Sequence, residues 1–250
     1  RLCGSGFQAI VTAANAIQLG DTGIAVAGGD ESKSRSCDMM PAARWGVRMG
    51  DAKILDMMVG ALTDPFETVH MGVTAENVAA KFGISRELQD AFAVESHKRA
   101  ARATEAGHFK EQILPIEIST KKGPVQFVLD EHIRADASIE GMAKLKTAFK
   151  KEGGSVTPGN ASGINDAAAA VVLMEASAAA KAGLKPLARL VSYAVAGVDP
   201  SIMGTGPIPA VQMALKRAGM KASDLDVIES NEAFAAQALC VLKALDLDPA

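Results

Sequence analysis

The sequence has few aromatic residues, no excess of one charge and no long hydrophobic run. One tryptophan and one tyrosine stand among 250 residues, and the net charge is −3. The longest apolar run, residues 167–174, is far shorter than the ~18 residues that a membrane span needs. We therefore expect no membrane association. The near-neutral balance of charge is also untypical of a protein that binds nucleic acid.

Cysteines are also scarce. Cys3, Cys37 and Cys240 are odd in number and show no CxxC spacing. This pattern argues against a disulfide framework and against a zinc site, and it leaves at least one thiol free. The chain does not open with a charged and then apolar targeting signal. We expect a cytoplasmic location, or an organelle interior reached through a segment preceding Arg1.

Small and apolar residues are abundant. Hydrophobic residues make up 48% of the chain and charged residues 22%, a balance typical of a globular protein. Residues 7–19 show helical spacing of apolar side chains, and residues 23–29 form a short apolar run typical of a buried parallel strand. This order of elements predicts an α/β fold with a doubly wound sheet.

The middle of the chain has a different texture. Residues 31–162 mix charges, methionines and turn residues, which predicts a large excursion away from the sheet. Within it, Ser85 is a suitable N-cap for a helix that runs to about residue 106. Glu87 lies in its first turn and Gly107 follows its end, as expected for a capped helix.

The last third returns to alternating strands and helices. The pattern predicts strands over 167–175, 186–198 and 224–230, and helices that end at Gly183, span 207–218 and begin near Asn231. A turn between a strand and a helix occurs at Cys3 and again at Asn231, which indicates two similar halves.

Cys3 stands directly before a predicted helix. Free amides and the positive end of the helix dipole favour a thiolate there, so Cys3 is a candidate nucleophile. The alternative is a small buried core thiol, and position alone does not decide between them. Ser5 lacks the GxSxG spacing of a serine hydrolase, and Cys37 and Cys240 lack a helix start.

Two further polar sites have structural and functional interpretations. His70 lies between apolar residues before a predicted helix, as either a hydrogen-bonded structural group or a catalyst, whereas His97, His108 and His132 have polar surroundings and are expected in solvent. Asn231 follows a predicted strand, where ligands bind in open α/β sheets, and it could equally cap the next helix.

The glycine-rich segment 153–168 could hold a ligand with its backbone amides, or could simply be a turn. No GxGxxG or Walker sequence accompanies it, so a nucleotide site of either kind is not indicated.

Taken together, these motifs resemble one family. RLCGSGFQAI, HMGVTAENVA, GNASGINDAAAAV and ESNEAFAAQA occur in this order along the chain. They resemble the thiolase family from end to end, with most similarity to its acetyl-CoA acetyltransferase and β-ketothiolase members. The resemblance implies thiolase-like doubled α/β/α layers, incomplete here, with an inserted loop domain.

The resemblance also implies a division into domains. Residues 1–31 and 163–186 would belong to the N-terminal half, and 187–250 would begin the C-terminal half. Residues 32–162 would form the loop domain, which covers coenzyme A and helps to build a homotetramer or dimer. The first strands would precede Arg1, and a GHP histidine and a CxGGG cysteine would follow Ala250.

Residue by residue, the resemblance implies that Cys3 accepts the acyl group and that its N–H serves one oxyanion hole. Asn231 would position a water in the other hole. The residues implied to line the coenzyme A site are His70, Met71, Arg134, Leu145, Phe149, Ser162, Met203 and Phe234. Gly141 departs from the serine of close relatives, so one hydrogen bond to the coenzyme would be missing.

The implied activity is condensation of two acetyl-CoA molecules to acetoacetyl-CoA, and the reverse thiolysis. Coenzyme A would be a substrate, with no tightly bound cofactor and no metal. Alternatives are a longer-chain 3-ketoacyl-CoA thiolase and a non-catalytic protein that binds coenzyme A. A ketoacyl synthase shares the nucleophile turn, but NEAFAAQ and the long loop domain argue against it.

Overall fold

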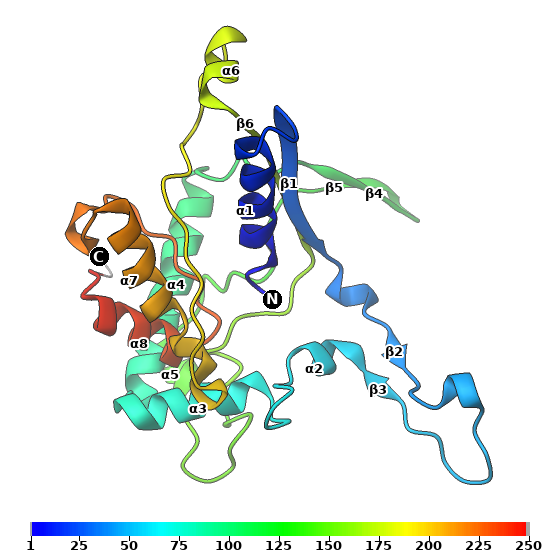
Figure 1. Cartoon of the computed structure of the whole chain (residues 1–250). Coiled ribbons are helices and arrows are strands. Elements are labelled where there is room, and N and C mark those ends of the chain that lie inside the picture. Colours follow the sequence, from blue (N-terminus) through cyan, green and yellow to red (C-terminus); the bar gives the residue numbers. More distant parts are fainter. Residues whose placement is uncertain (1, 249–250) are drawn as a thin grey trace. The chain divides into compact units, whose positions relative to one another are not determined.

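The computed structural model (Figure 1) describes residues 2–248. The chain divides into two compact units. The first unit comprises residues 1–71, 164–200 and 206–227, and the second comprises residues 72–163, 201–205 and 228–250. Arg1, Pro249 and Ala250, at the outer ends of the predicted domain segments, lie outside the described residues.

The first unit is built on two long strands. Strand β1 (Ile24–Glu31) pairs with β6 (Ala167–Met174) in antiparallel register, from Ile24 opposite Met174 to Glu31 opposite Ala167. The prediction of a parallel, buried β1 was wrong. The strands are antiparallel because the chain leaves β1 and enters β6 at the same end of the pair. The strand is also largely exposed, since among the β1 side chains only Ala27 is buried.

The helix predicted over residues 7–19 is present as α1 (Ser5–Gln18), and it packs along this strand pair (Figure 1). A Cβ added to Gly29 would stand 3.8 Å from the Cα of Gly6, and one added to Gly28 would lie 2.3 Å from the Ala169 carbonyl oxygen. Because a backbone oxygen cannot move aside easily, the strand pair requires glycine at position 28.

A carboxylate joins the two ends of the excursion between β1 and β6. Asp166 accepts a hydrogen bond from the Ser34 backbone N–H at 2.9 Å and further bonds from the Ser34 and Ser32 hydroxyls. These bonds, led by that of the Ser34 hydroxyl, hold the pKa of the Asp166 carboxyl below its usual value.

The remaining elements of the first unit are short. They are β2 (Asp38–Met39), which pairs with β3 (Leu55–Asp56), the helices α2 (Met57–Ala61), α6 (Ala176–Lys181) and α7 (Pro207–Ala218), and the 3-10 turns Lys33–Arg35, Ala43–Trp45 and Ala222–Asp224. Helix α7 has the predicted bounds, since proline starts it and Gly219, with φ of 68°, ends it.

Two predicted strands are absent from the structure. Residues 224–230 form no strand, and neither do residues 186–198, although exposure still alternates over 191–200. In this segment the Ser192 hydroxyl donates to the Ala214 carbonyl, and the Tyr193 carbonyl accepts from Arg217. Both partners lie on helix α7, so the segment is extended but bonds to a helix instead of a neighbouring strand.

The second unit contains most of the buried apolar side chains. Its elements are the helices α3 (Met71–Phe82), α4 (Arg86–Glu105), α5 (Ile139–Ala143) and α8 (Ala235–Leu245), the hairpin of β4 (Ile116–Thr120) and β5 (Gly123–Phe127), and part of the 3-10 turn Pro200–Thr205. Val78, Val94, Val156 and Val241 are among its buried residues. The predicted caps of α4 are confirmed, because Ser85 accepts the Leu88 N–H at 3.3 Å.

Candidate functional site

Cys3 lies in the turn that leads into α1, and its side chain is exposed. The Ser5 N–H closes this turn by donating to the Leu2 carbonyl at 3.0 Å, and Gly4 is the N-cap of the helix. The alternative interpretation of Cys3 as a buried core thiol is therefore wrong for the described structure. The thiol is exposed one residue before the N-cap of α1.

His70 and Met71 are held just before and at the start of α3. His70 forms a β-bridge with Thr63, and the Met71 N–H donates to the Leu62 carbonyl at 2.8 Å. Both side chains are half-buried. Burial lowers the pKa of His70, so its neutral form is favoured at pH 7.

Asn231 is exposed and precedes α8 by four residues. The helix begins at Ala235 with Phe234 as its N-cap, so the interpretation of Asn231 as the cap was wrong. The backbone after Asn231 is instead paired with the segment 160–162. The Ser162 N–H donates to Ala233 at 3.0 Å, and the Ala235 N–H donates to Asn160 at 2.9 Å.

The structure brings three of the predicted coenzyme A residues together in the second unit. Phe234 forms a β-bridge with Ala161, next to Ser162. The rings of Phe149 and Phe234 meet edge to face, with centroids 6.3 Å apart and planes at 82°. Phe149 also covers Gly72, where an added Cβ would stand 2.2 Å from the ring.

Three other predicted residues lie elsewhere on the second unit. Leu145 packs on Gly159, where an added Cβ would lie 2.5 Å from its Cδ1. Arg134 is exposed, and its backbone N–H donates to the Nδ1 of His97 at 3.2 Å. Met203 is exposed in the 3-10 turn Pro200–Thr205.

His97 is half-buried, so its predicted exposure was wrong, whereas His108 and His132 are exposed as predicted. The rings of His97 and His132 have centroids 6.0 Å apart. Burial lowers the pKa of His97, and the positive charges of His132 and Arg134 lower it further. The bond from the Arg134 N–H also requires an unprotonated Nδ1.

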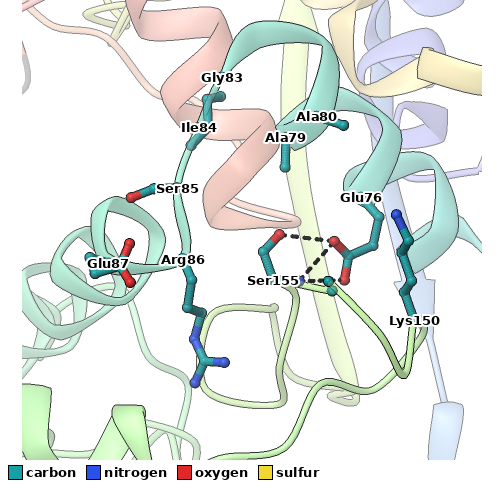
Figure 2. A pocket seen from close by; sticks show the side chains of 12 residues that line it. Glu76, Ala79, Ala80, Gly83, Ile84, Ser85, Arg86, Glu87, Lys150 and Ser155 are labelled. Atoms are coloured by element: carbon teal, nitrogen blue, oxygen red, sulfur yellow. Dashed lines mark hydrogen bonds between the residues drawn. The ribbon is translucent and has the colours of Figure 1, made fainter.

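One important carboxylate was missed by the sequence analysis. Glu76 on α3 is 7% exposed and accepts the Ser155 backbone N–H at 2.9 Å and the Ser155 hydroxyl (Figure 2). It also accepts the Val156 backbone N–H at 2.9 Å. The glycine-rich segment 153–168 was interpreted as either a ligand-binding loop or a simple turn, and two of its amides bind a side chain of the protein. The only sequence signal was a lone glutamate among small and apolar helix residues.

Glu76 also borders the hollow drawn in Figure 2, which has a volume of about 470 Å³. Lys150, Arg86 and Glu87 contribute the other charged groups of its lining. Among residues 2–248, no three His, Cys, Asp or Glu side chains cluster so that they could hold a metal ion. Within the same described range, every helix is too short or too polar to cross a membrane.

Comparison with known proteins identifies the family. The family described as "Thiolase, N-terminal domain" matches residues 1–177, and "Thiolase, C-terminal domain" matches residues 184–250. The chain belongs to the thiolase family.

Relatives in this family are similar over the whole chain. The β-ketothiolase BktB of Cupriavidus necator is 64% identical over 100% of this chain and 64% of its own length, and an acetyl-CoA acetyltransferase of Chromobacterium violaceum is 54% identical over 98% and 62%. The chain thus spans less than two thirds of the length of these relatives.

Solved structures share the fold. The crystal structure of the Bacillus anthracis acetyl-CoA acetyltransferase matches with a TM-score of 0.94 and 50% identity, over 98% of this chain and 62% of that one. Human mitochondrial 3-ketoacyl-CoA thiolase in complex with CoA matches with a TM-score of 0.93 and 44% identity, over 99% and 61%. The predicted thiolase-like α/β fold is confirmed.

Proposed function

We propose that this chain carries the acyl-accepting cysteine of an acyl-CoA C-acyltransferase. The reaction is the condensation of two acetyl-CoA molecules to acetoacetyl-CoA, together with the reverse thiolysis of 3-ketoacyl-CoA. The observation that carries this proposal is the exposed thiol of Cys3 at the start of α1, in a chain of the thiolase family.

Covalent catalysis divides the reaction into two steps. In the first step, the Cys3 thiolate attacks the thioester carbonyl of acetyl-CoA, a new C–S bond forms, and coenzyme A leaves as its thiolate. In the second step, the α-carbon of another acetyl-CoA loses a proton and attacks the acyl-cysteine carbonyl. A C–C bond forms, and the Cys3 thiolate is released.

Each step passes through an oxyanion that needs hydrogen-bond donors. The Cys3 backbone N–H is proposed to serve one oxyanion and a water held by Asn231 the other, and such donors are worth about 10²–10³ in rate. Exposure of Asn231 and its release from helix capping leave its amide available for this role. The proton transfers need a base, and no GHP histidine or CxGGG cysteine occurs in residues 1–250.

The coenzyme A site is proposed to include the cluster of Phe149, Ser162 and Phe234, because apolar rings beside a polar hydroxyl suit the pantetheine chain. Leu145, Arg134, Met203, His70 and Met71 are proposed as further contacts. The relative named as a complex with CoA supports coenzyme A as the ligand.

Incubation of the protein with acetyl-CoA, followed by mass spectrometry of the intact chain and its peptides, tests the proposal. We expect the mass of an acetyl group on the peptide that contains Cys3, and no such mass after treatment with iodoacetamide. A Cys37→Ala variant is a matched control, since Cys37 is also exposed and should not be needed. Full thiolysis activity in a Cys3→Ala variant would exclude the nucleophile role.

The same assay separates the rival functions. A longer-chain 3-ketoacyl-CoA thiolase would give a higher kcat/KM with longer ketoacyl-CoA substrates than with acetoacetyl-CoA. A protein that only binds coenzyme A would show heat of binding in calorimetry but no thioester on Cys3. The relative named acetyl-CoA acetyltransferase, at 54% identity, supports acetyl-CoA as the substrate.

We also propose a homotetramer or dimer in the cytoplasm, without a tightly bound cofactor. Light scattering coupled to size-exclusion chromatography would measure the oligomeric state, and a monomer at micromolar concentration would contradict it. Cell fractionation would test the location, and absorbance and metal analysis of the purified protein would test for a bound group.

A further inference from the structure

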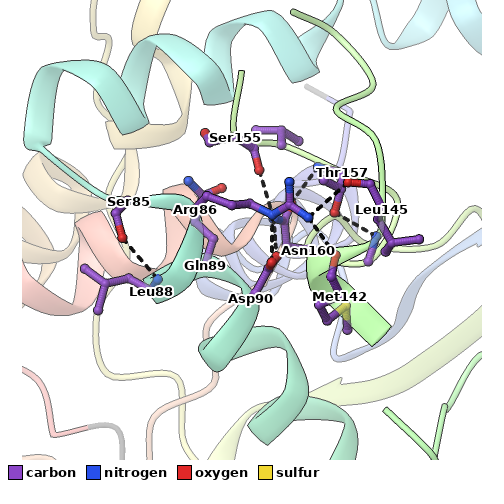
Figure 3. A network of polar contacts seen from close by, with 12 residues as sticks. Ser85, Arg86, Leu88, Gln89, Asp90, Met142, Leu145, Ser155, Thr157 and Asn160 are labelled. Atoms are coloured by element: carbon purple, nitrogen blue, oxygen red, sulfur yellow. Dashed lines mark hydrogen bonds and ion pairs between the residues drawn. The ribbon is translucent and has the colours of Figure 1, made fainter. Parts of the chain in front are cut away.

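A buried polar cluster joins α4, the end of α5 and the connection 144–166 in the second unit (Figure 3). Arg86 and Asp90, one turn apart on α4, form an ion pair with 2.7 Å between Nε and Oδ2. The other oxygen of Asp90 accepts a 2.9 Å bond from the side-chain amide of Asn160. Asp90 and Asn160 are 4% and 2% exposed, so these bonds are shielded from water.

At both ends of the cluster, Arg86 and Asn160 form hydrogen bonds with backbone groups. The guanidinium of Arg86 donates to the carbonyls of Met142 at 2.7 Å and Leu145 at 3.2 Å. The amide of Asn160 also donates to the Ser155 carbonyl at 3.0 Å, and its oxygen accepts the Thr157 N–H at 2.8 Å. The cluster therefore contacts the end of α5 and holds the course of the connection 144–166 that follows it.

The connection 144–166 carries groups of the proposed site. Leu145 lies near its start, and residues 160–162, further along it, pair with residues 233–235. Asn160 takes part with its own backbone, because its carbonyl accepts the Ala235 N–H at 2.9 Å. A change in the side chain of Asn160 would thus move the backbone that follows Asn231.

We propose that Arg86, Asp90 and Asn160 are positioning residues of the acyl-transfer site. Asn160 sets the place of Asn231 and Ser162, and Arg86 sets the place of Leu145. None of the three needs to touch the substrate. This inference rests on the proposed function, because it concerns the coenzyme A and oxyanion groups of that same site.

Asn160→Asp tests the first part, since it keeps the size of the side chain but replaces its donor by an oxygen facing Asp90. Two adjacent carboxylates repel each other, and the Ser155 carbonyl loses its donor. We expect kcat for thiolysis to fall about tenfold and KM for coenzyme A to rise, because displacement by about 1 Å costs up to ~10²-fold in rate. Adding Asp90→Asn to this variant restores one donor–acceptor pair. The double variant should therefore recover part of the fall in kcat and part of the rise in KM.

Arg86→Lys tests the second part. Lysine can keep the ion pair with Asp90 but cannot reach two further carbonyls with a planar group. We expect a several-fold higher KM for coenzyme A with kcat nearly unchanged. Arg102→Lys is the matched control, since Arg102 lies on the same helix in an exposed ion pair with Glu95 and should leave both constants unchanged.

Each kcat is calculated per mole of Cys3 that acetyl-CoA can acylate. A variant that merely yields less folded protein therefore keeps the kcat of the wild type. A purely structural role would lower the amount of acylated Cys3 and leave kcat per site and KM as in the wild type, and this result would overturn the inference. If the Asn160→Asp variant does not fold, the kcat and KM of the Arg86→Lys variant test the inference. A wild-type protein without thioester formation and without coenzyme A binding in calorimetry would instead refute the proposed function.

Discussion

Phe149 and Phe234 meet edge to face across the second unit, with ring centroids 6.3 Å apart. Their contact joins the connection after α5 to the N-cap residue of α8. Such a contact adds about 0.5–1.5 kcal/mol to the free energy gained from burial alone. It places two of the residues implied to line the coenzyme A site against each other, 85 positions apart in sequence.

Replacement of Phe149 by alanine is expected to lower the free energy of unfolding by about 1–3 kcal/mol, less than for a fully buried ring because Phe149 is half-buried. The ring that covers Gly72 would be lost together with the edge-to-face contact. Urea denaturation measures the change. Phe66→Ala removes a ring that is 79% exposed and should change stability by less than about 0.5 kcal/mol; equal effects of the two variants would contradict the packing described.

Glu76→Gln should destabilise the protein by about 1–3 kcal/mol, because an NH₂ group would face donors of Ser155 or Val156 and leave them without an acceptor. Glu111→Gln, at an exposed position, is the control and should have little effect. Hydrogen exchange of the Ser155 and Val156 amides gives a local readout. Unchanged protection of these two amides in Glu76→Gln would show that the carboxylate does not hold the loop.

The three cysteines should differ in reactivity toward iodoacetamide. Cys3 and Cys37 are exposed, whereas Cys240 on α8 is 2% exposed and burial raises the pKa of its thiol. We expect two thiols to be alkylated in the native protein and the third only after denaturation. A Cys240→Ala variant should show two reactive thiols in both conditions; rapid labelling of Cys240 in the native wild type would contradict its burial.

Stability is expected to fall in mild acid. The folded state lowers the pKa of His97 through burial and the charges of His132 and Arg134, against the opposite effects of Glu232 and Asp136. As pH falls below about 6.5, the unfolded chain takes up a proton that the folded chain resists. The contribution of His97 to the free energy of unfolding is therefore lost from about pH 6.5 down to its lower folded pKa.

Urea denaturation between pH 5 and 7.5 would measure this loss. His97→Asn keeps an acceptor for the Arg134 N–H but does not titrate, so the decline should become shallower. Exposed His108 serves as the control, and His108→Gln should retain the wild-type dependence. An identical slope in wild type and His97→Asn would exclude His97 as a source. His70, whose pKa burial also lowers, accounts for part of the remaining slope.

Local features of the sequence predicted those parts of the structure that depend only on residues close together in the chain, such as the ends of helices. The starts and ends of α4 and α7 follow from Ser85, Gly107, Pro207 and Gly219, because helix caps are completed within one turn of the chain. The place of Cys3 before α1 is local in the same sense. The division into domains and the roles of the site residues remain predictions.

Tertiary structure alone decided the rest. Alternation along residues 186–198 indicated a strand, but a strand requires a partner, and this segment bonds to α7. The direction of β6 against β1 depends on how the intervening residues return. The bonds of Glu76 to Ser155 and of Asp90 to Asn160 join residues 79 and 70 positions apart, so no local pattern reveals them. Sequence therefore determined the candidate nucleophile, and the fold determined the polar contacts that hold the backbone around Asn231.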